Sequence, residues 1–161
     1  MNLKAAVGLA ILVSGGIAAA AGRSPSAFPL KIGAFKAGFR NCSRPTPQGI
    51  TSYWQVNQSD VERIDEALMQ YLERKGLLKM LRTPLSAYGR QYLGYNRGER
   101  RFVYINAFMR SSGDTKSTYV RWCDGGNLFW GIEYDMKGKT FTGFEIDGVE
   151  GDPLEGLKLH E

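Results

Sequence analysis

The chain has 161 residues, of which 43% are hydrophobic, and it carries 21 Lys and Arg against 16 Asp and Glu. These proportions are typical of one small folded domain, and they exclude a disordered chain, a collagen-like chain and a multi-pass membrane protein. The basic residues are dispersed rather than gathered in one face or tail, so the charge does not indicate a nucleic-acid partner.

The N-terminal residues 1–21 have the pattern of a signal peptide. Lys4 supplies an early positive charge, residues 5–20 carry no charge, and Ala19 to Ala21 are small enough for a cleavage site. The alternative is a retained membrane anchor, but the apolar run falls short of the roughly 20 strongly apolar residues of a spanning helix. We expect cleavage near Ala21, a periplasmic or secreted protein, and no membrane span after processing.

Cys42 and Cys123 are the two cysteines of the chain. In an oxidising compartment two thiols are expected to pair if the fold brings them within bridging distance. The alternative is a nucleophilic thiol, which usually needs a neighbouring base, and the one histidine, His160, lies next to the C-terminal residue. We therefore predict a disulfide between Cys42 and Cys123, no cofactor and no metal site.

Proline and glycine divide the rest of the chain. Residues 22–58 are rich in Gly, Pro and Ser, which predicts an irregular leader with an edge strand around residues 30–35. Residues 59–148 have helical and then strand-like patterns, and we expect one α+β domain there. Residues 149–161 are rich in Gly and acidic residues, which indicates a flexible tail.

One main helix is predicted from residue 59. Ser59 and Glu62 have the spacing of a capping box, and Gly76 ends the helical pattern. Apolar residues recur on one face, namely Val61, Ile64, Leu68, Tyr71 and Leu72. The opposite face, which includes Asp65, is charged and is expected to face solvent.

Aromatic and β-branched residues separated by Gly and Asn predict strands from residue 90 onward. The expected strands cover residues 91–95, 101–108, 119–123, 129–134 and 140–146. Gly98 suits the tight turn of the first hairpin, because that turn requires a positive φ. Gly131 and Gly143 interrupt the second hairpin, which indicates bulges or a ring lying close over the backbone.

The strand at residues 101–108 has two unlike faces. One is purely aliphatic and is expected to pack on the helix; it consists of Val103, Ile105 and Ala107. The other is expected to be partly open or covered by the leader; it consists of Phe102, Tyr104, Asn106 and Phe108. One helix packed on a curved antiparallel sheet of about five strands is an α+β fold. The layout is similar to cystatin-like folds, a comparison that indicates no activity.

Four segments resemble small exported bacterial proteins of uncharacterised activity: RQYLGY at 90–95, VYINAF at 103–108, CDGG at 123–126 and FWGIEYD at 129–135. The resemblance covers roughly residues 88–148. It implies a bacterial envelope location and a sheet domain, with no established reaction, ligand or catalytic residue.

Rings and turn residues of the sheet region are the candidate binding residues. Stiff amphipathic rings often anchor a partner at a binding surface. The candidates are Tyr95, Tyr104, Trp122, Asp124, Asn127 and Trp130. The alternative is that most of these rings fill the interface between helix and sheet, and that Trp122 packs on the disulfide.

Four carboxylates fall at alternating positions of the last hairpin: Glu133, Asp135, Glu145 and Asp147. Residues i and i+2 share a sheet face, so these groups could converge for acid–base catalysis or Ca²⁺ binding. The stronger alternative is a solvent-facing side of the hairpin, paired with Arg101 or Arg121. No nucleophile elbow, phosphate-binding loop or dinucleotide fingerprint is present.

These patterns favour an exported, non-enzymatic binding protein, inhibitor-like or immunity-like, that recognises a protein or glycan of the cell envelope through rings and hairpin turns. Two alternatives stay open. One is a hydrolase or Ca²⁺-dependent module that uses the four carboxylates, and the other is a structural component of the envelope.

Overall fold

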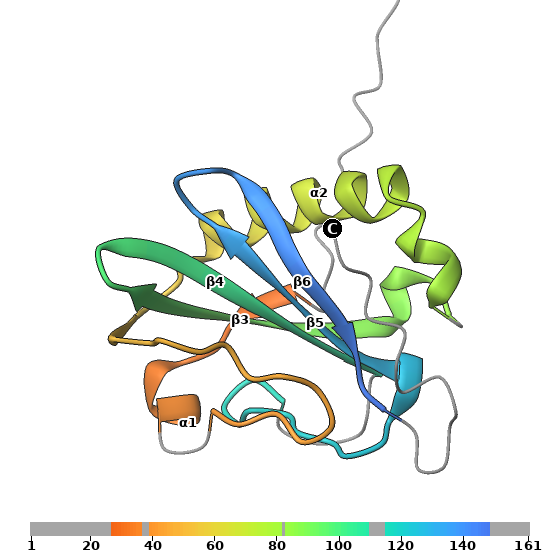
Figure 1. Ribbon diagram of the computed structural model, residues 1–161, viewed down its shortest axis with the longest axis horizontal. Helices are drawn as coiled ribbons and strands as arrows, with labels where there is room; N and C mark the ends of the chain where they lie inside the picture. The colour runs from red at the N-terminus through yellow and green to blue at the C-terminus, as the bar shows by residue number, and fades with distance from the viewer. Residues whose placement is uncertain (1–26, 37–38, 82, 110–114, 149–161) are drawn as a thin grey trace, which may run out of the picture.

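The computed structural model describes residues 27–36, 39–81, 83–109 and 115–148. One long helix lies on one side of a mixed six-stranded sheet, and loops cover the other side (Figure 1). The architecture is therefore α+β with one main helix, as predicted. The expected signal peptide and C-terminal tail lie outside the described residues.

The main helix, α2, spans Gln58–Arg74, and its apolar face is the predicted one. Val61, Ile64, Leu68 and Leu72 are fully buried. The predicted capping box is wrong, because Asn57 is the N-cap and its side-chain oxygen accepts a hydrogen bond from the amide of Asp60 at 2.7 Å. Asn caps a helix as well as Ser does, and here it precedes Ser59 by two residues. No helix within the described ranges is long and apolar enough to cross a bilayer.

Asp65 does not face solvent, contrary to the expectation from its position on the charged side of α2. Its carboxylate accepts hydrogen bonds from the guanidinium of Arg90 at 2.7 and 3.0 Å and from the hydroxyl of Tyr92 at 2.6 Å. The side chain of Arg90 is only 2% exposed. A buried cation needs a charged partner, so this pair ties α2 to the sheet.

Two hairpins form the body of the sheet, and both were predicted. Strands β3 (Tyr88–Arg97) and β4 (Arg100–Met109) pair along their full length, and Gly98 takes a φ of 61° in the turn. Strands β5 (Phe129–Asp135) and β6 (Thr140–Ile146) form the second hairpin, beside β4. The order is β3, β4, β5, β6.

The two glycines of the second hairpin have the roles that their positions indicated. The register between β5 and β6 shifts between Gly131 and Glu133, and Gly143 has a φ of 63°. A Cβ atom on Gly131 would lie 2.0 Å from the hydroxyl oxygen of Tyr104. Glycine at position 131 therefore lets this ring lie against the backbone of β5.

Two short strands precede α2 and share one edge of β3. Strand β1 (Ala27–Pro29) runs parallel to β3, and β2 (Ser52–Trp54) runs antiparallel to it. The fully antiparallel sheet expected from the sequence is therefore wrong. The edge strand expected around residues 30–35 is also wrong, because Ile32–Lys36 forms the short helix α1. The long crossover between β1 and β3 permits the parallel pairing.

The strand expected at residues 119–123 is absent, and this segment is a loop. The backbone groups of Val120, in this segment, bond to side chains instead of to a neighbouring strand. The amide of Val120 donates to the side chain of Gln91 at 3.0 Å, and its carbonyl oxygen accepts from Asn106 at 2.8 Å. These side-chain bonds satisfy the backbone without a ladder.

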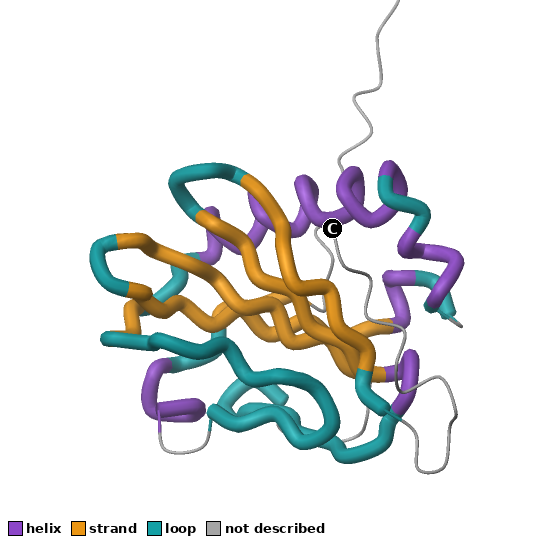
Figure 2. The backbone as a smooth tube through the Cα atoms, viewed as in Figure 1, coloured by secondary structure: helices purple, strands orange, loops and turns teal. Residues whose placement is uncertain are grey.

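The core has two parts, one on each face of the sheet. Val103, Ile105 and Ala107 pack with the apolar face of α2, as predicted. On the opposite face, Phe102 and Tyr104 pack with residues of the leader, including Leu30, Phe35 and Phe39. Figure 2 shows α2 on one side of the strands and the loops gathered on the other. Of the two arrangements expected for the aromatic face, coverage by the leader is the correct one.

Candidate functional site

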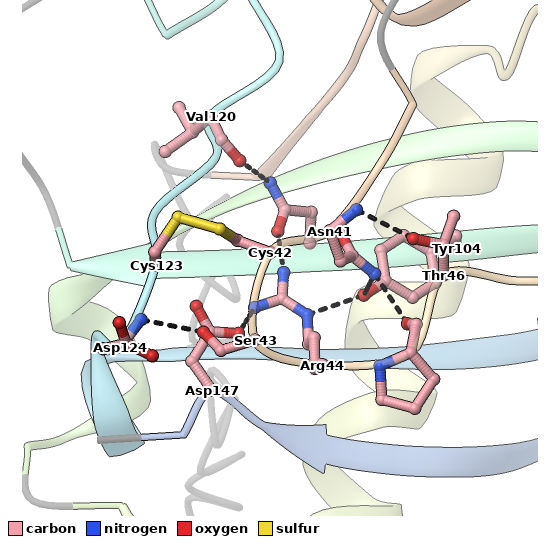
Figure 3. Close-up of polar contacts among 12 residues, drawn as sticks. Asn41, Cys42, Ser43, Arg44, Thr46, Tyr104, Val120, Cys123, Asp124 and Asp147 are labelled. Carbon is pink, nitrogen blue, oxygen red and sulfur yellow. Dashed lines mark hydrogen bonds and ion pairs between the residues drawn. A yellow bond between two sulfur atoms is a disulfide. The ribbon is translucent and has the colours of Figure 1, made fainter. Parts of the chain in front are cut away.

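Arg44 is the centre of a buried polar network on the loop-covered face (Figure 3). Its Nε donates to the hydroxyl oxygen of Tyr104 at 2.8 Å. Its two terminal nitrogens donate to the carboxylate of Asp147 and to the side-chain oxygen of Asn106. The side chains of Arg44 and Asp147 are 5% and 1% exposed. The guanidinium thus joins the loop before β2, the sheet and the end of β6.

The network continues through two amide side chains at the centre of the sheet. Asn106 on β4 donates to Gln91 on β3 at 2.9 Å, and these two residues are register partners. Gln91 donates to the carbonyl oxygens of Thr115 and Thr118, each at 2.7 Å. Both amides are almost completely buried, and together they hold residues 115–120 on the sheet.

A disulfide joins the two loops that cover this face, as predicted. Cys42 and Cys123 are bonded across a sequence separation of 81 residues, with Cα atoms 5.0 Å apart. Beside the disulfide, the amide of Asp124 donates to the hydroxyl of Ser43 at 2.7 Å (Figure 3). The amide of Asn41 donates to the hydroxyl of Thr46 at 2.8 Å. Covalent and polar contacts therefore fix the same pair of loops.

Burial governs the electrostatics of the network. Burial raises the pKa of the Asp147 carboxyl above its usual range, and the charge of Arg44 opposes this rise. Burial alone would lower the pKa of Arg44, but the oxygens of Tyr104 and Asp147 outweigh it and raise that pKa. Burial also raises the pKa of the Tyr104 hydroxyl. Because these groups are enclosed and bonded to one another, they act as a clamp for the loops.

Three of the six candidate binding residues are buried, which corrects their assignment as surface anchors. Tyr95 and Trp130 are 0% exposed, and Tyr104 is 3% exposed. Trp130 packs in the core under α2, and the hydroxyl of Tyr95 bonds to Glu133. Trp130 therefore lies at the interface between helix and sheet, as the alternative interpretation expected, whereas Tyr95 and Tyr104 lie in the core on the opposite face.

The other three candidates lie in residues 122–127, on either side of the disulfide-bonded Cys123. Trp122 is 61% exposed, and its ring stacks on that of Phe129 with centroids 5.8 Å apart. Asp124 is exposed and has a φ of 58°. Asn127 is half-buried and donates to the carbonyl oxygen of Met80 at 3.2 Å. Trp122 is thus the one candidate ring that reaches solvent.

Three of the four carboxylates pair with three different arginines instead of converging. Glu133 pairs with Arg97 at 3.0 Å, Asp135 pairs with Arg100, and Asp147 pairs with Arg44, while Glu145 lies opposite Gly131 in the register of the hairpin. The expected partners, Arg101 and Arg121, form none of these pairs; the guanidinium of Arg101 lies over the ring of Trp54 instead. Within the described parts of the chain, no group of three or more His, Cys, Asp or Glu residues is placed to hold a metal ion.

Sequence reasoning missed the importance of Arg44, Gln91 and Asn106. Arg44 lies in an aperiodic, proline-rich segment, where no pattern indicates burial. Asn106 offered a signal, because it is a polar residue on the aromatic face of an otherwise apolar strand. A buried amide in that position needs polar partners, and Gln91, Arg44 and Val120 provide them.

Comparisons of this chain with protein family models, with curated proteins and with solved structures found no match.

Proposed function

We propose that this chain is an exported, non-enzymatic binding protein that recognises a macromolecule of the cell envelope through Trp122 and the disulfide-bonded loop that carries it. The observation that carries the proposal is the exposure of Trp122. Trp122 is 61% exposed. Among the described residues, the other exposed large hydrophobic residues are Met69 and Met80, each of which is 42% exposed.

The surroundings of Trp122 support a role in recognition. The neighbouring Cys123 is bonded to Cys42, and the indole ring stacks on Phe129 with an interplanar angle of 13°. Both contacts restrict the ring before a partner arrives, which reduces the conformational entropy lost on binding. Trp is also among the residues that most often dominate the binding free energy of an interface.

The buried network supports the non-enzymatic part of the proposal. Arg44, Tyr104 and Asp147 are buried and bonded to one another, so their polar groups hold loops in place. An inhibitor-like or immunity-like protein binds without reacting, and such a scaffold suits that role. The single long helix across one face of the sheet supports the cystatin-like layout as part of this proposal, together with the resemblance to exported bacterial proteins.

Capture of partners from an envelope extract tests the proposal, with Trp122→Ala as the variant and Met69→Ala as the matched control. Met69 lies on α2, on the opposite side of the sheet. We expect Trp122→Ala to weaken binding of the captured partner about 30-fold or more, as loss of an interface Trp commonly does, and Met69→Ala to leave it unchanged. Equal affinity of all three proteins for every captured partner would contradict the proposal.

The disulfide provides a second arm of the same experiment. A Cys42→Ser/Cys123→Ser variant retains Trp122 but loses its covalent anchor. Provided that circular dichroism shows a folded protein, we expect weaker binding with a faster dissociation rate, because the loop must then be ordered on binding. Unchanged kinetics would show that recognition does not depend on this anchored loop.

A further inference from the structure

We propose that a pocket beside the disulfide binds an organic oxyanion, with the guanidinium groups of Arg40 and Arg121 as its cationic partners. The pocket has a volume of about 680 Å³. That size is within the usual range for sites that hold a small molecule. Trp122 does not line it, so anion binding goes beyond the function proposed above.

The charge of the pocket indicates the class of ligand. Arg40 and Arg121 both line it, both are exposed, and neither forms an ion pair with any residue in the described ranges. None of the lining residues is acidic. A guanidinium recognises planar and tetrahedral oxyanions through paired hydrogen bonds, so a carboxylate or a phosphate suits this site.

A part of the pocket lining is apolar and can contact the body of an organic anion. Phe39, Pro47, Ile50 and Tyr53 contribute this apolar part of a lining that is otherwise polar. Phe39 is 8% exposed and packs edge-on against Tyr104, so its ring is held in place. Sites for organic ligands commonly combine apolar surface with oriented polar groups.

The loop that forms most of the pocket is rigidly held. Cys42 is bonded to Cys123, the side chain of Asn41 donates to the carbonyl oxygen of Pro45 at 2.7 Å, and Gln48 donates to that of Thr46 at 2.7 Å. The carbonyl oxygen of Gln48 also accepts from Arg97 at 2.9 Å. A preformed loop loses little conformational entropy when a ligand binds, which increases the affinity for a ligand that fits it.

Two kinds of ligand carry such an oxyanion: a free organic anion, and a peptide with an acidic side chain. Titration of the folded, oxidised protein, followed by amide chemical shifts, distinguishes them. The probes are phenyl phosphate, phenylacetate, inorganic phosphate and N-acetyl-Asp-Glu amide. We expect saturable shifts in residues 40–50, and tighter binding of the phenyl probes than of inorganic phosphate because Phe39 and Tyr53 contact the ring. Tighter binding of the dipeptide than of phenylacetate would identify a peptide source, and the reverse order a free anion.

Charge-neutralising variants show whether the arginines of the pocket bind phenyl phosphate. Arg40→Gln and Arg121→Gln should each weaken the affinity for phenyl phosphate about tenfold, as loss of one charged hydrogen bond does. Arg74→Gln is the control, because it makes the same charge change at the exposed end of α2, and it should alter affinity less than twofold.

Absence of saturable shifts with every probe would overturn the proposal, and so would equal weakening by all three variants. Trp122→Ala should leave phenyl phosphate binding unchanged. The two proposals therefore fail separately: a loss of partner capture in Trp122→Ala supports the binding function whatever the outcome of the anion titration.

Discussion

The two faces of the sheet are stabilised by different kinds of interaction. Under α2 the core is mainly apolar, with Ile64, Leu68 and Ile105 fully buried, and the ion pair of Arg90 with Asp65 is a charged contact on this side. Across the sheet, rings share the face with a polar network centred on Arg44 and with a disulfide. The stabilisation from apolar burial depends mainly on the area removed from water. The stabilisation from a buried polar network depends on every hydrogen-bond partner being in place.

This difference separates the scaffold from the surface for which we propose binding. The regular helix and the paired strands on one face give a rigid support. On the other face, residues 39–50 and 115–128 have little regular structure, and they carry both Trp122 and the proposed anion pocket. Loops positioned by a rigid scaffold commonly carry binding residues, and here covalent and polar clamps replace the missing backbone ladder.

The largest expected effect lies in the apolar core. Trp130→Ala should lower the free energy of unfolding by about 3–5 kcal/mol, because it removes a fully buried ring and leaves a cavity. The ring of Trp130 packs against Tyr88 and Phe144 at centroid distances of 5.9 and 5.5 Å. Urea denaturation measures the loss. Replacing the exposed Trp122 by Ala should lower the free energy of unfolding by less than about 1 kcal/mol. Similar losses in the two variants would refute the assignment of Trp130 as buried and Trp122 as exposed.

A slightly smaller effect is expected from the polar clamp. Arg44→Met should lower the free energy of unfolding by about 3 kcal/mol, because it leaves the carboxylate of Asp147 buried without its cation. Adding Asp147→Leu should restore part of the loss, since the double variant buries no unpaired charge. Urea denaturation of both single variants and the double variant measures the coupling. Strictly additive losses would show that the two residues do not act as a pair.

The smallest effect is expected at the solvent-facing end of the hairpins. Burial alone would raise the pKa of the Asp135 carboxyl, but hydrogen bonds from Arg100 and from the backbone amides of Lys137 and Gly138 lower it. A carboxyl whose pKa is lowered by folding stabilises the fold above its unfolded pKa, and this contribution is lost as the pH falls through the folded value.

Asp135→Asn should therefore cost about 0.5 kcal/mol at pH 7, the usual value for a partly exposed ion pair. The difference from the unsubstituted protein should disappear as the pH falls below the ordinary Asp value of 3.8. Urea midpoints of both proteins at pH 7 and pH 3 provide the measurement. A difference that stays constant between these pH values would contradict the lowered pKa.

Sequence reasoning succeeded where local periodicity carries the information. The apolar face of α2, the hairpins at Gly98 and at residues 136–139, and the aliphatic side of β4 follow from spacing alone, because the burial pattern repeats with the helix or strand. The disulfide was predictable from the number of cysteines and the expected compartment.

Sequence reasoning failed where a distant side chain replaces a backbone partner. Residues 119–123 have the composition of a strand, but Gln91 and Asn106 bond to the backbone of Val120, and the segment stays a loop. Tyr95 and Trp130 have the composition of binding anchors, but their register places them in the two core layers. Neither outcome is encoded in a window of neighbouring residues.

The sequence by itself determined one amphipathic helix, two hairpins and a pair of cysteines, because each depends on residues close in the chain or on composition. Only the tertiary structure decided which ring stays exposed, that Arg44 meets Asp147 across the fold, and that β1 joins β3 in parallel. These features depend on contacts between residues far apart in the chain. The free energy that each of these contacts contributes depends on the burial of its groups and on their partners. Both exist only once the two faces of the sheet are covered.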